Sequence, residues 1–409
     1  MKTFQIDKKS LFGQASLLFY SAAGMLITLF CSRTALALLM GFFIAVALVH
    51  KEFNKQIGQF LRSPLLWSMS LLFLLPFISG LWSEDKSNWV SVIYLKLPLL
   101  FMPLAFAGNW FFTKRQWEIL ALLFIGLVTA GSIWSLAQYL GNMAAVHEEY
   151  LKAKTLLSPH DIDRVRFGWM ISVSILLCSW LGIQKRKTFP LFSIILLVNA
   201  VLLIIFLHVL AVRTGLLSFY SMVLISAIWL AFRGRRTAWA LLIIVALPIL
   251  AYKVFPTFHN RVRYFLYEMP YFKNASYLPG ANDAVRVISI KAGWAVFNQH
   301  PVTGVGFGDI SKQVSDWYEK NYPQMLAQDR IEPSSQWILY GDGCGWLGFL
   351  AFITIMIIPF TIKARIGLPW YLLNASMLIS LVFDVGLEIQ YGVFLYTFMV
   401  LWCWKWREN

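Results

Sequence analysis

Long apolar runs alternate with short polar stretches along most of the chain. A helix of roughly 20 apolar residues crosses the hydrocarbon core of a membrane, which is about 30 Å thick. Runs near this length occupy residues 11–31, 34–50, 65–82, 89–107, 117–140, 168–184, 189–211, 214–232, 237–254, 337–360, 366–386 and 388–404. The pattern predicts an all-α, polytopic membrane protein with about twelve transmembrane helices, in one membrane domain over residues 1–409.

Three of these runs leave an alternative open. Residues 89–107 contain Lys96 and two prolines, and the runs 189–211 and 214–232 almost touch. The pattern alone does not separate a full span from a re-entrant segment at these places. The first apolar run lacks a small-residue cleavage site and is followed at once by another run, so we expect no cleavable signal peptide.

Residues 255–336 form the longest polar interruption and predict a large helical loop outside the membrane. Cap residues at its Asn282 begin a helical pattern over residues 282–298. Residues 312–328 have the pattern of an interfacial amphipathic helix interrupted by Pro323. A second, smaller polar stretch at residues 141–167 predicts another loop on the same side.

The distribution of basic residues predicts on which side of the membrane each loop lies. The chain has 59% hydrophobic and 13% charged residues and a net charge of +15, which in a soluble protein would indicate nucleic-acid binding. Here the basic residues occupy alternate loops, near residues 2–9, 51–62, 114–115, 185–187, 233–236, 363–365 and 405–407. Because cytoplasmic loops are rich in Lys and Arg, we expect both termini in the cytoplasm and residues 141–167 and 255–336 outside. The expected surroundings are membrane lipids, with no nucleic acid.

Cysteine and histidine give no sign of a metal site. The four cysteines lie in or beside apolar runs without metal-ligand spacing, and the six histidines show no paired motif. We expect no disulfide framework, no metal and no cofactor. His208 lies alone inside an apolar run and is expected to be a hydrogen-bonded structural residue.

Charged residues near the predicted outer face are the candidates for chemistry. Arg213 falls where two apolar runs meet, and an arginine at membrane depth costs several kcal/mol unless it is paired or solvated. Arg164 and Arg166 lie at the outer interface, either as snorkelling anchors or as contacts for an anionic lipid-linked substrate. Asp384 and Glu388 have no basic neighbour in their own turn, so we expect outer-face arginines as partners.

Four segments in order resemble a known family. They are the run from Arg286 through Trp294 to HPVTGVGFG at residues 300–308, AVRTGLL at 211–217, QWILY at 336–340 followed by Gly345 and Gly348, and FDVGLEIQYG at 383–392. Together they resemble the O-antigen ligase and polymerase superfamily of bacterial envelope glycosyltransferases. The resemblance implies ten to fourteen spans, a large periplasmic loop late in the chain and a place in the bacterial inner membrane.

The resemblance also implies a donor, a glycan carried on a polyprenyl diphosphate. Guanidinium groups bind phosphate oxygens in pairs and neutralise the leaving diphosphate without a metal. Arg213 and Arg286 are therefore expected to bind the diphosphate and act in catalysis, with Arg164 and Arg166 as companions. Gly304, Gly306 and Gly308 are expected either to shape a loop over the site or to form a tight turn between two helices. A nucleotide-binding interpretation fails because no strand is predicted before these glycines.

One departure from the family pattern concerns the general base. Ligases have His-Asn before the segment that corresponds to residues 336–340, whereas this chain has Ser334 and Ser335. The carboxyl groups of Glu332, Asp342, Asp384 and Glu388 are possible substitutes, and Glu332 and Glu388 are carried forward as catalytic candidates.

Three functions follow from these expectations. The first is a ligase that moves a finished glycan to lipid A–core, and the second is a polymerase that extends the glycan on its lipid carrier. The absent histidine favours the polymerase more than the family pattern alone would. The third, a transporter of a lipid-linked sugar, is opposed by the late basic outer loop and by the lack of an internal repeat or of paired broken helices. In either transferase, catalysis is expected to be independent of divalent metals.

Overall fold

The structure is a computed structural model that describes residues 13–49, 52–150, 156–159, 163–233, 238–363 and 366–406. Its regular elements in this part of the chain are all helical, and no strand occurs there. The α-helices are α2 (Gln14–Thr28), α3 (Arg33–Leu48), α4 (Phe53–Arg62), α5 (Pro64–Ser79), α6 (Lys86–Phe106), α7 (Lys114–Gly141), α8 (Met143–Tyr150), α9 (Arg164–Lys185), α10 (Pro190–Leu210), α11 (Arg213–Phe232), α12 (Ala238–Val254), α13 (Pro256–Lys273), α14 (Asp283–Gln299), α15 (Ile310–Asn321), α16 (Gln336–Thr361), α17 (Leu368–Val382) and α18 (Gln390–Lys405). Two 3₁₀ helices, η1 (Ala327–Asp329) and η2 (Gly386–Glu388), complete the list. The all-α prediction is confirmed.

Each of the twelve predicted apolar runs contains a helix, but the number of spans is not confirmed. Within the described part of the chain, six helices are long and apolar enough to cross a membrane, namely α6, α7, α9, α10, α11 and α16. The number rises to seven if α3 and α4 together make one bent span. The apolar helices α2, α5 and α17 have only 15 or 16 residues. At 1.5 Å per residue they reach about 23 Å, which is short of the full hydrocarbon thickness.

Local signals in the sequence explain where several helices begin. Thr113 and Gln116 form a capping box at the start of α7, each side chain bonding to the other's backbone N–H. At the start of α9, the side chain of Asp163 accepts a hydrogen bond from the backbone N–H of Val165. Pro190 occupies the first position of α10, where its missing N–H costs nothing.

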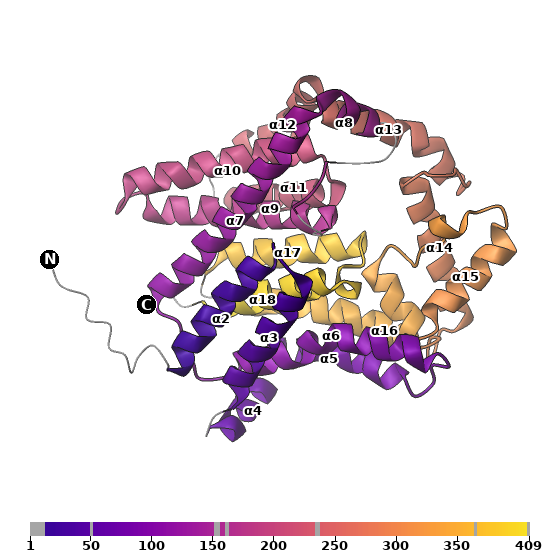
Figure 1. Cartoon of the computed structure of the whole chain (residues 1–409), viewed down its shortest axis with the longest axis horizontal. Helices are drawn as coiled ribbons and strands as arrows, with labels where there is room; N and C mark the ends of the chain where they lie inside the picture. The colour runs from indigo at the N-terminus through magenta and orange to yellow at the C-terminus, as the bar shows by residue number, and fades with distance from the viewer. Residues whose placement is uncertain are drawn as a thin grey trace.

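The helices form two groups that α17 joins. In one group α9 packs against α10 and α11, and in the other α5 packs against α6 and α16 while α18 packs against α6 (Figure 1). Helix α17 contacts α11 in the first group and α16 and α18 in the second. Every residue of α18 from Tyr391 to Cys403 is buried. Helix α18 therefore lies in the core of the molecule, beside α6 and α17.

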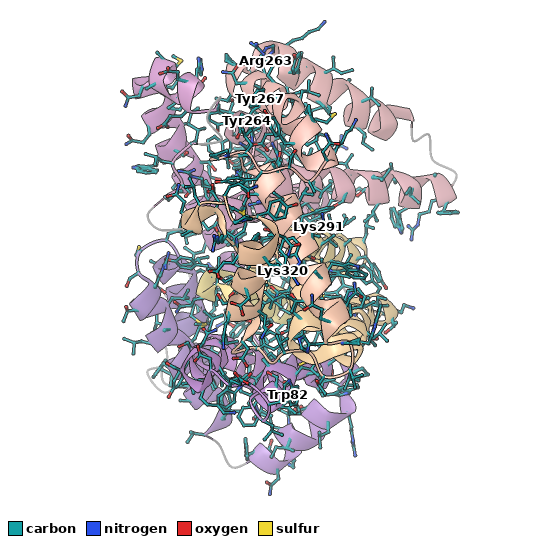
Figure 2. The ribbon with its side chains drawn as sticks, turned by 90° about the vertical axis from the view of Figure 1, so that its right-hand side faces the viewer. Trp82, Arg263, Tyr264, Tyr267, Lys291 and Lys320 are labelled. Carbon is teal, nitrogen blue, oxygen red and sulfur yellow. The ribbon has the colours of Figure 1, made fainter. Side chains whose placement is uncertain are left out.

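The predicted outer loop forms one end of the molecule. Helices α14 and α15 lie at the right of Figure 1, opposite the end where the C-terminus lies. Figure 2 views this end directly, with Arg263 and Tyr267 of α13 above Lys291 of α14, Lys320 of α15 and Trp82 of the turn after α5. The helix predicted over residues 282–298 is confirmed within one residue at each end. The side of the membrane on which this end lies remains a prediction.

The helix predicted over residues 312–328 is shorter than expected. Helix α15 begins at Ile310 and ends at Asn321. Tyr322 is extended away from helical geometry, with φ −139° and ψ 59°. It precedes Pro323, and the proline ring disfavours helical geometry in the residue before it. The proline thus ends the helix instead of interrupting it.

The glycine-rich segment inserts into a break in α16. Cys344 and Gly345 leave helical geometry there, with φ +63° at Gly345. The carbonyl groups of Asp342 and Gly343 accept hydrogen bonds from the N–H groups of Val305 (2.8 Å) and Gly306 (3.1 Å). A Cβ on Gly304 would lie 2.4 Å from the carbonyl oxygen of Asp342. Only glycine allows this approach of the two backbones.

Candidate active site

A cavity of about 440 Å³ gathers five arginines at the start of the membrane helices, and we call it the arginine cavity. The charged residues that line it are Arg164, Arg166, Arg213, Arg261 and Arg286, with Asp163, Asp283, Glu332 and Asp384. The four arginines that the sequence predicted for the diphosphate thus lie together. They come from positions up to 122 residues apart in the chain, from Arg164 to Arg286.

Three helices point their N-terminal ends at the arginine cavity. Helix α9 begins at Arg164, α11 begins at Arg213 and α14 begins at Asp283. The N-terminal end of a helix carries a partial positive charge, so it favours an anion. At the starts of α9 and α14, Asp163 and Glu268 already accept hydrogen bonds from backbone N–H groups. The guanidinium groups and the helix ends therefore both favour an anion in the cavity.

Close packing of two helices brings Arg166 and Arg213 to the same wall. Gly168 of α9 and Gly215 of α11 meet backbone to backbone, and a Cβ on Gly215 would lie 2.8 Å from the carbonyl carbon of Gly168. Just before α11, Ala211 has a left-handed conformation with φ +48°, which reverses the chain directly after α10. The almost continuous runs 189–211 and 214–232 are therefore two helices joined by a tight turn.

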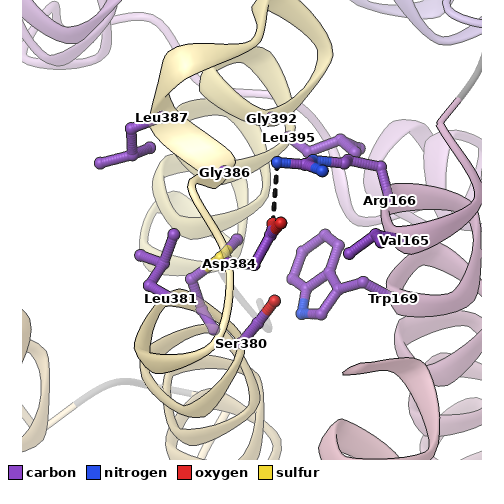
Figure 3. A pocket seen from close by; sticks show the side chains of 11 residues that line it. Val165, Arg166, Trp169, Ser380, Leu381, Asp384, Gly386, Leu387, Gly392 and Leu395 are labelled. Atoms are coloured by element: carbon purple, nitrogen blue, oxygen red, sulfur yellow. Dashed lines mark ion pairs between the residues drawn. The ribbon is translucent and has the colours of Figure 1, made fainter. Parts of the chain in front are cut away.

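Ion pairs between described residues hold Arg166 and Arg213. Arg166 bonds to Asp384, with 2.8 Å between Nη2 and Oδ2, and to Asp163, with 2.9 Å between Nη1 and Oδ2. Figure 3 shows the Arg166–Asp384 pair beside Trp169 and Ser380. The expectation that an outer-face arginine pairs with Asp384 is confirmed. Arg213 pairs with Asp283 of α14.

Arg164 and Arg286 form no ion pair with any described residue, although both line the cavity. Arg286 is only half-buried. Burial lowers the pKa of Arg261, and the charge of Arg286 lowers it further. An anion in the cavity would offset both effects, because it would supply the opposite charge that buried cations require.

Glu332 is the carboxyl group in this cavity that is best suited to exchange a proton. The side chain is solvent-exposed, but the protein atoms around it partly remove water and raise its pKa, and the negative charge of Glu388 raises it further. A hydrogen bond with Ser311 and the charge of Lys96 act in the opposite direction. Burial also raises the pKa of Asp384, against the effect of Arg166. Asp384 is held by Arg166, whereas Glu332 has no ion pair among the described residues and its side chain bonds to Ser311. Glu332 is therefore the carboxyl group of the lining that we expect to face a substrate.

Glu388 has a different partner from the one expected. It forms an ion pair with Lys96 of α6, whose side chain is fully buried, and accepts a hydrogen bond of 2.7 Å from Nε2 of Gln336. Lys96 also donates to the carbonyl oxygen of Leu387, at 3.0 Å. The prediction of an arginine partner for Glu388 was wrong, because α6 packs beside the turn that contains Glu388 and places Lys96 next to it. Glu388 is not among the described residues that line the arginine cavity.

Ser334 lies on the cavity wall, where ligases have a histidine. Its hydroxyl group and that of Ser289 in α14 are 3.0 Å apart, and its backbone N–H donates to the same Ser289 oxygen at 3.1 Å. A serine hydroxyl has no basic group of its own, so it positions α14 but does not replace the histidine as a base. Asp342 is fully buried in α16 and is likewise outside the described lining of the cavity.

Gly304, Gly306 and Gly308 are not among the described residues of the cavity lining either. Gly306 and Gly308 pack against the turn that precedes α6, where a Cβ on Gly306 would lie 2.2 Å from Ser83 Oγ and one on Gly308 2.4 Å from the carbonyl oxygen of Asp85. The structure therefore places these glycines in a connection that docks α14 and α15 onto the membrane helices. Of the two roles expected for them, the tight turn fits this position.

The model of the family described as O-antigen ligase matches residues 198–353 of this chain. The resemblance to the O-antigen ligase and polymerase superfamily is confirmed. The matched segment contains Arg213, Arg261, Arg286 and Glu332, while Arg164, Arg166 and Asp384 reach the same cavity from outside it. A comparison with curated proteins gives no match. The O-antigen ligase family is one of membrane glycosyltransferases, and the several apolar helices of this chain agree with a multi-pass membrane protein.

Sequence reasoning missed Arg261 and Asp283 as parts of the site, and Lys96 as the partner of Glu388. Arg261 and Glu268 are seven residues apart on α13 and so lie on one face of that helix. Glu268 is fully buried and accepts hydrogen bonds from the N–H groups of Asn282 (2.8 Å) and Asp283 (2.7 Å). A helix predicted over residues 256–273 would have put Arg261 and Glu268 on one face, but the position of that face beside the start of α14 follows only from the fold.

No group of three or more His, Cys, Asp or Glu side chains is arranged to hold a metal ion within the described ranges. His208 bonds to the carbonyl oxygen of Ile204 at 2.7 Å and to the hydroxyl of Tyr220 at 2.6 Å, as expected for a structural histidine. Cys178, Cys344 and Cys403 are buried and free, and Cys31 is free and exposed.

Proposed function

We propose that this O-antigen ligase family member transfers a glycan from a polyprenyl diphosphate to lipid A–core. The arginine cavity is the observation that carries the proposal, because it presents five guanidinium groups and three helix N-termini at one place. Such a cavity suits a diphosphate, whose oxygens accept bidentate hydrogen bonds from guanidinium groups. The donor would reach the cavity from the outer leaflet of the bacterial inner membrane, so the cavity would face the periplasm.

Arg286 and Arg213 are the proposed diphosphate ligands, with Arg164 and Arg261 beside them. Arg286 and Arg164 have no ion pair among the described residues, so their donors are available to phosphate oxygens. Arg213 would exchange part of its contact with Asp283 for the diphosphate. Arg166 is held by two carboxylates, and its proposed role is to fix the wall of the cavity through Asp384.

The proposed reaction has a balanced course. An acceptor hydroxyl oxygen attacks the anomeric carbon of the donor sugar, and the bond from that carbon to the diphosphate oxygen breaks. The electron pair leaves with the polyprenyl diphosphate, whose added negative charge the arginines neutralise. The hydroxyl proton passes to Glu332, the proposed general base. Glu388 would act through Glu332, by raising the pKa of that carboxyl group.

We further propose that transfer needs no divalent metal, because the guanidinium groups already supply positive charge at the leaving group. Turnover of the purified protein in excess EDTA tests this proposal. Inhibition by EDTA that Mg²⁺ or Mn²⁺ reverses would contradict it.

A polymerase that extends the glycan on its carrier is the second candidate. Ser334 and Ser335 in place of the ligase His-Asn favour it, since the usual ligase base is absent. The surface glycan of a deletion strain separates the two. Full-length chains left on the lipid carrier, with none on lipid A–core, support the ligase. Single repeat units attached to lipid A–core would contradict the ligase and support the polymerase.

A further inference from the structure

A second cavity, of about 460 Å³, lies at the other end of the membrane helices, and we call it the Arg62 cavity. Its lining includes Gln59, Arg62, Asn109, Phe111, Lys363 and Lys405. Helix α18 runs between the two cavities: Ile389, just before its start, lines the arginine cavity, and Lys405, its last residue, lines the Arg62 cavity. With 16 residues in α18, the two cavities are separated by about 24 Å.

The Arg62 cavity is positively charged. Arg62, Lys363 and Lys405 line it, and none of the described lining residues is acidic. No ion pair between described residues involves Arg62 or Lys363, and both side chains are exposed. Amide groups add polar contacts at the rim, where Gln59 donates to Asn109 at 2.6 Å. The cavity therefore offers cationic and hydrogen-bonding groups to an anion.

Lys405 gives the cavity a fixed inner wall. Its side chain is buried and donates to the carbonyl oxygens of Phe106 (2.8 Å) and Gly108 (2.5 Å). Its Nζ lies 3.8 Å from the centre of the Trp110 ring. These contacts fix the end of α18 to the turn after α6. Arg62 and Lys363, which are exposed, line the same cavity as the buried Lys405.

The surroundings of the Arg62 cavity have the character of a membrane interface. Helix α4 is strongly amphipathic, with Arg62 in its last turn and Leu61 64% exposed beside it. Phe111, which lines the cavity, is 41% exposed. The helices α6 and α18 end here after crossing the apolar part of the molecule. The cationic cavity suits the phosphate of a phospholipid headgroup, and the apolar surface beside it suits the acyl chains.

We propose that the Arg62 cavity binds the headgroup phosphate of an anionic phospholipid from the leaflet opposite the arginine cavity. Basic hollows between membrane helices on the cytoplasmic side are suited to such headgroups. All four segments that line the cavity fall at or beside loops whose basic residues place them in the cytoplasm. The acyl chains would lie along the exposed apolar side chains of α4 and Phe111. This binding does not depend on the transfer reaction.

Native mass spectrometry of the purified protein tests the proposal, with phosphatidylglycerol and phosphatidylcholine titrated separately. We expect tighter binding of phosphatidylglycerol, and about 30-fold weaker affinity for it after the double substitution Arg62→Gln and Lys363→Gln. The control substitutions Lys114→Gln and Arg115→Gln remove the same charge from the same predicted side, outside the cavity lining, and should leave the affinity unchanged.

Three results would overturn the proposal. Equal affinity for the two lipids would show that the cavity does not select an anionic headgroup. An equal loss of affinity in the control protein would show that general surface charge, and not the cavity, attracts the lipid. Displacement of the lipid by millimolar inorganic phosphate would make the ligand a free anion instead. A circular-dichroism spectrum and a melting temperature for each variant confirm that folded proteins are compared.

Discussion

At the scale of single residues, the molecule depends on how it compensates charge inside an apolar helix. Lys96 is fully buried in α6 and is held by Glu388 and by the carbonyl oxygen of Leu387. Its ring neighbours, Phe307 and Tyr340, lie 5.4 and 5.5 Å from Nζ. Nothing in the apolar run 89–107 shows this pairing, because the partner lies 292 residues away. The sequence showed an expensive charge but not what compensates it.

Lys96→Met should therefore destabilise the protein strongly. Removing one partner of a buried ion pair typically costs about 3–5 kcal/mol, because the other charge stays buried. Thermal unfolding in detergent measures the loss. Adding Glu388→Gln should recover part of it, since the double variant has no uncompensated charge. The control Lys55→Met breaks an exposed pair with Glu52 and should change stability by less than about 1 kcal/mol. Equal melting temperatures for Lys96→Met and Lys55→Met would show that the Lys96 pair is not structural.

Glu332 sets the expected pH dependence of transfer. A general base acts only when it is deprotonated, so the rate should rise with pH through its pKa. Partial removal of water by the surrounding protein and the charge of Glu388 raise that pKa, which moves the rising limb to higher pH than a glutamate in free solution would give. In the variant with both Lys96→Met and Glu388→Gln the limb should move to lower pH, because the effect of Glu388 exceeds that of Lys96. Glu332→Gln should lose the limb with most of the activity. Full activity of Glu332→Gln with an unchanged pH profile would place the base elsewhere.

At the scale of helices, the arginine cavity depends on two close contacts between backbones. One brings α9 and α11 together at Gly168 and Gly215, and the other docks the glycine-rich segment into the break of α16. The helices in the apolar runs and the helix over residues 282–298 could be predicted, since they follow from local apolar spacing and cap residues. The break at Gly345 was not, because it is stabilised by the N–H groups of another segment.

Gly215→Ala should separate α9 from α11 and lower activity. The new methyl group would lie within 2.9 Å of three backbone atoms of Gly168. Overpacking of this kind costs about 1–3 kcal/mol and shifts the backbone, which would move Arg213 away from Arg166. Melting temperature and transfer rate are the measurements. The control Gly126→Ala in α7 places its methyl group in open space and should be harmless. Equal behaviour of the two variants would show that the close contact does not hold the site together.

At the scale of the whole molecule, charge patterning predicts which end faces which compartment. The apolar periodicity predicted the all-α class and a helix in each of the twelve apolar runs, but not α4 or α13. It did not give the number of spans, because helices as short as α2, α5 and α17 do not by length alone cross a membrane. Four arginines of the cavity were predicted from the sequence: Arg164, Arg166, Arg213 and Arg286. The fifth, Arg261, was found only once the position of α13 was known. The sides of the membrane follow only from the basic loops.

Cysteine labelling tests this orientation. In a Cys31→Ser background, Lys320→Cys should react with an impermeant thiol reagent added from the periplasm, because α15 belongs to the predicted outer end. Lys187→Cys, in the loop before α10, should react only after the inner membrane is opened. Both positions are exposed, so accessibility within the protein does not separate them. The opposite labelling pattern would put the arginine cavity on the cytoplasmic side.

The central claim is that the arginine cavity holds the diphosphate of the donor, and the transfer kinetics of Arg286→Lys test it most directly. Lysine keeps the charge but loses the planar pair of donors, so kcat/KM for the lipid-linked donor should fall by about 100-fold or more. Arg263→Lys, on the exposed outer face of α13 (Figure 2), is the matched control and should keep wild-type kinetics. A large loss in Arg286→Lys alone, with unchanged melting temperature, is the result we predict. Wild-type kcat/KM in Arg286→Lys would contradict the claim.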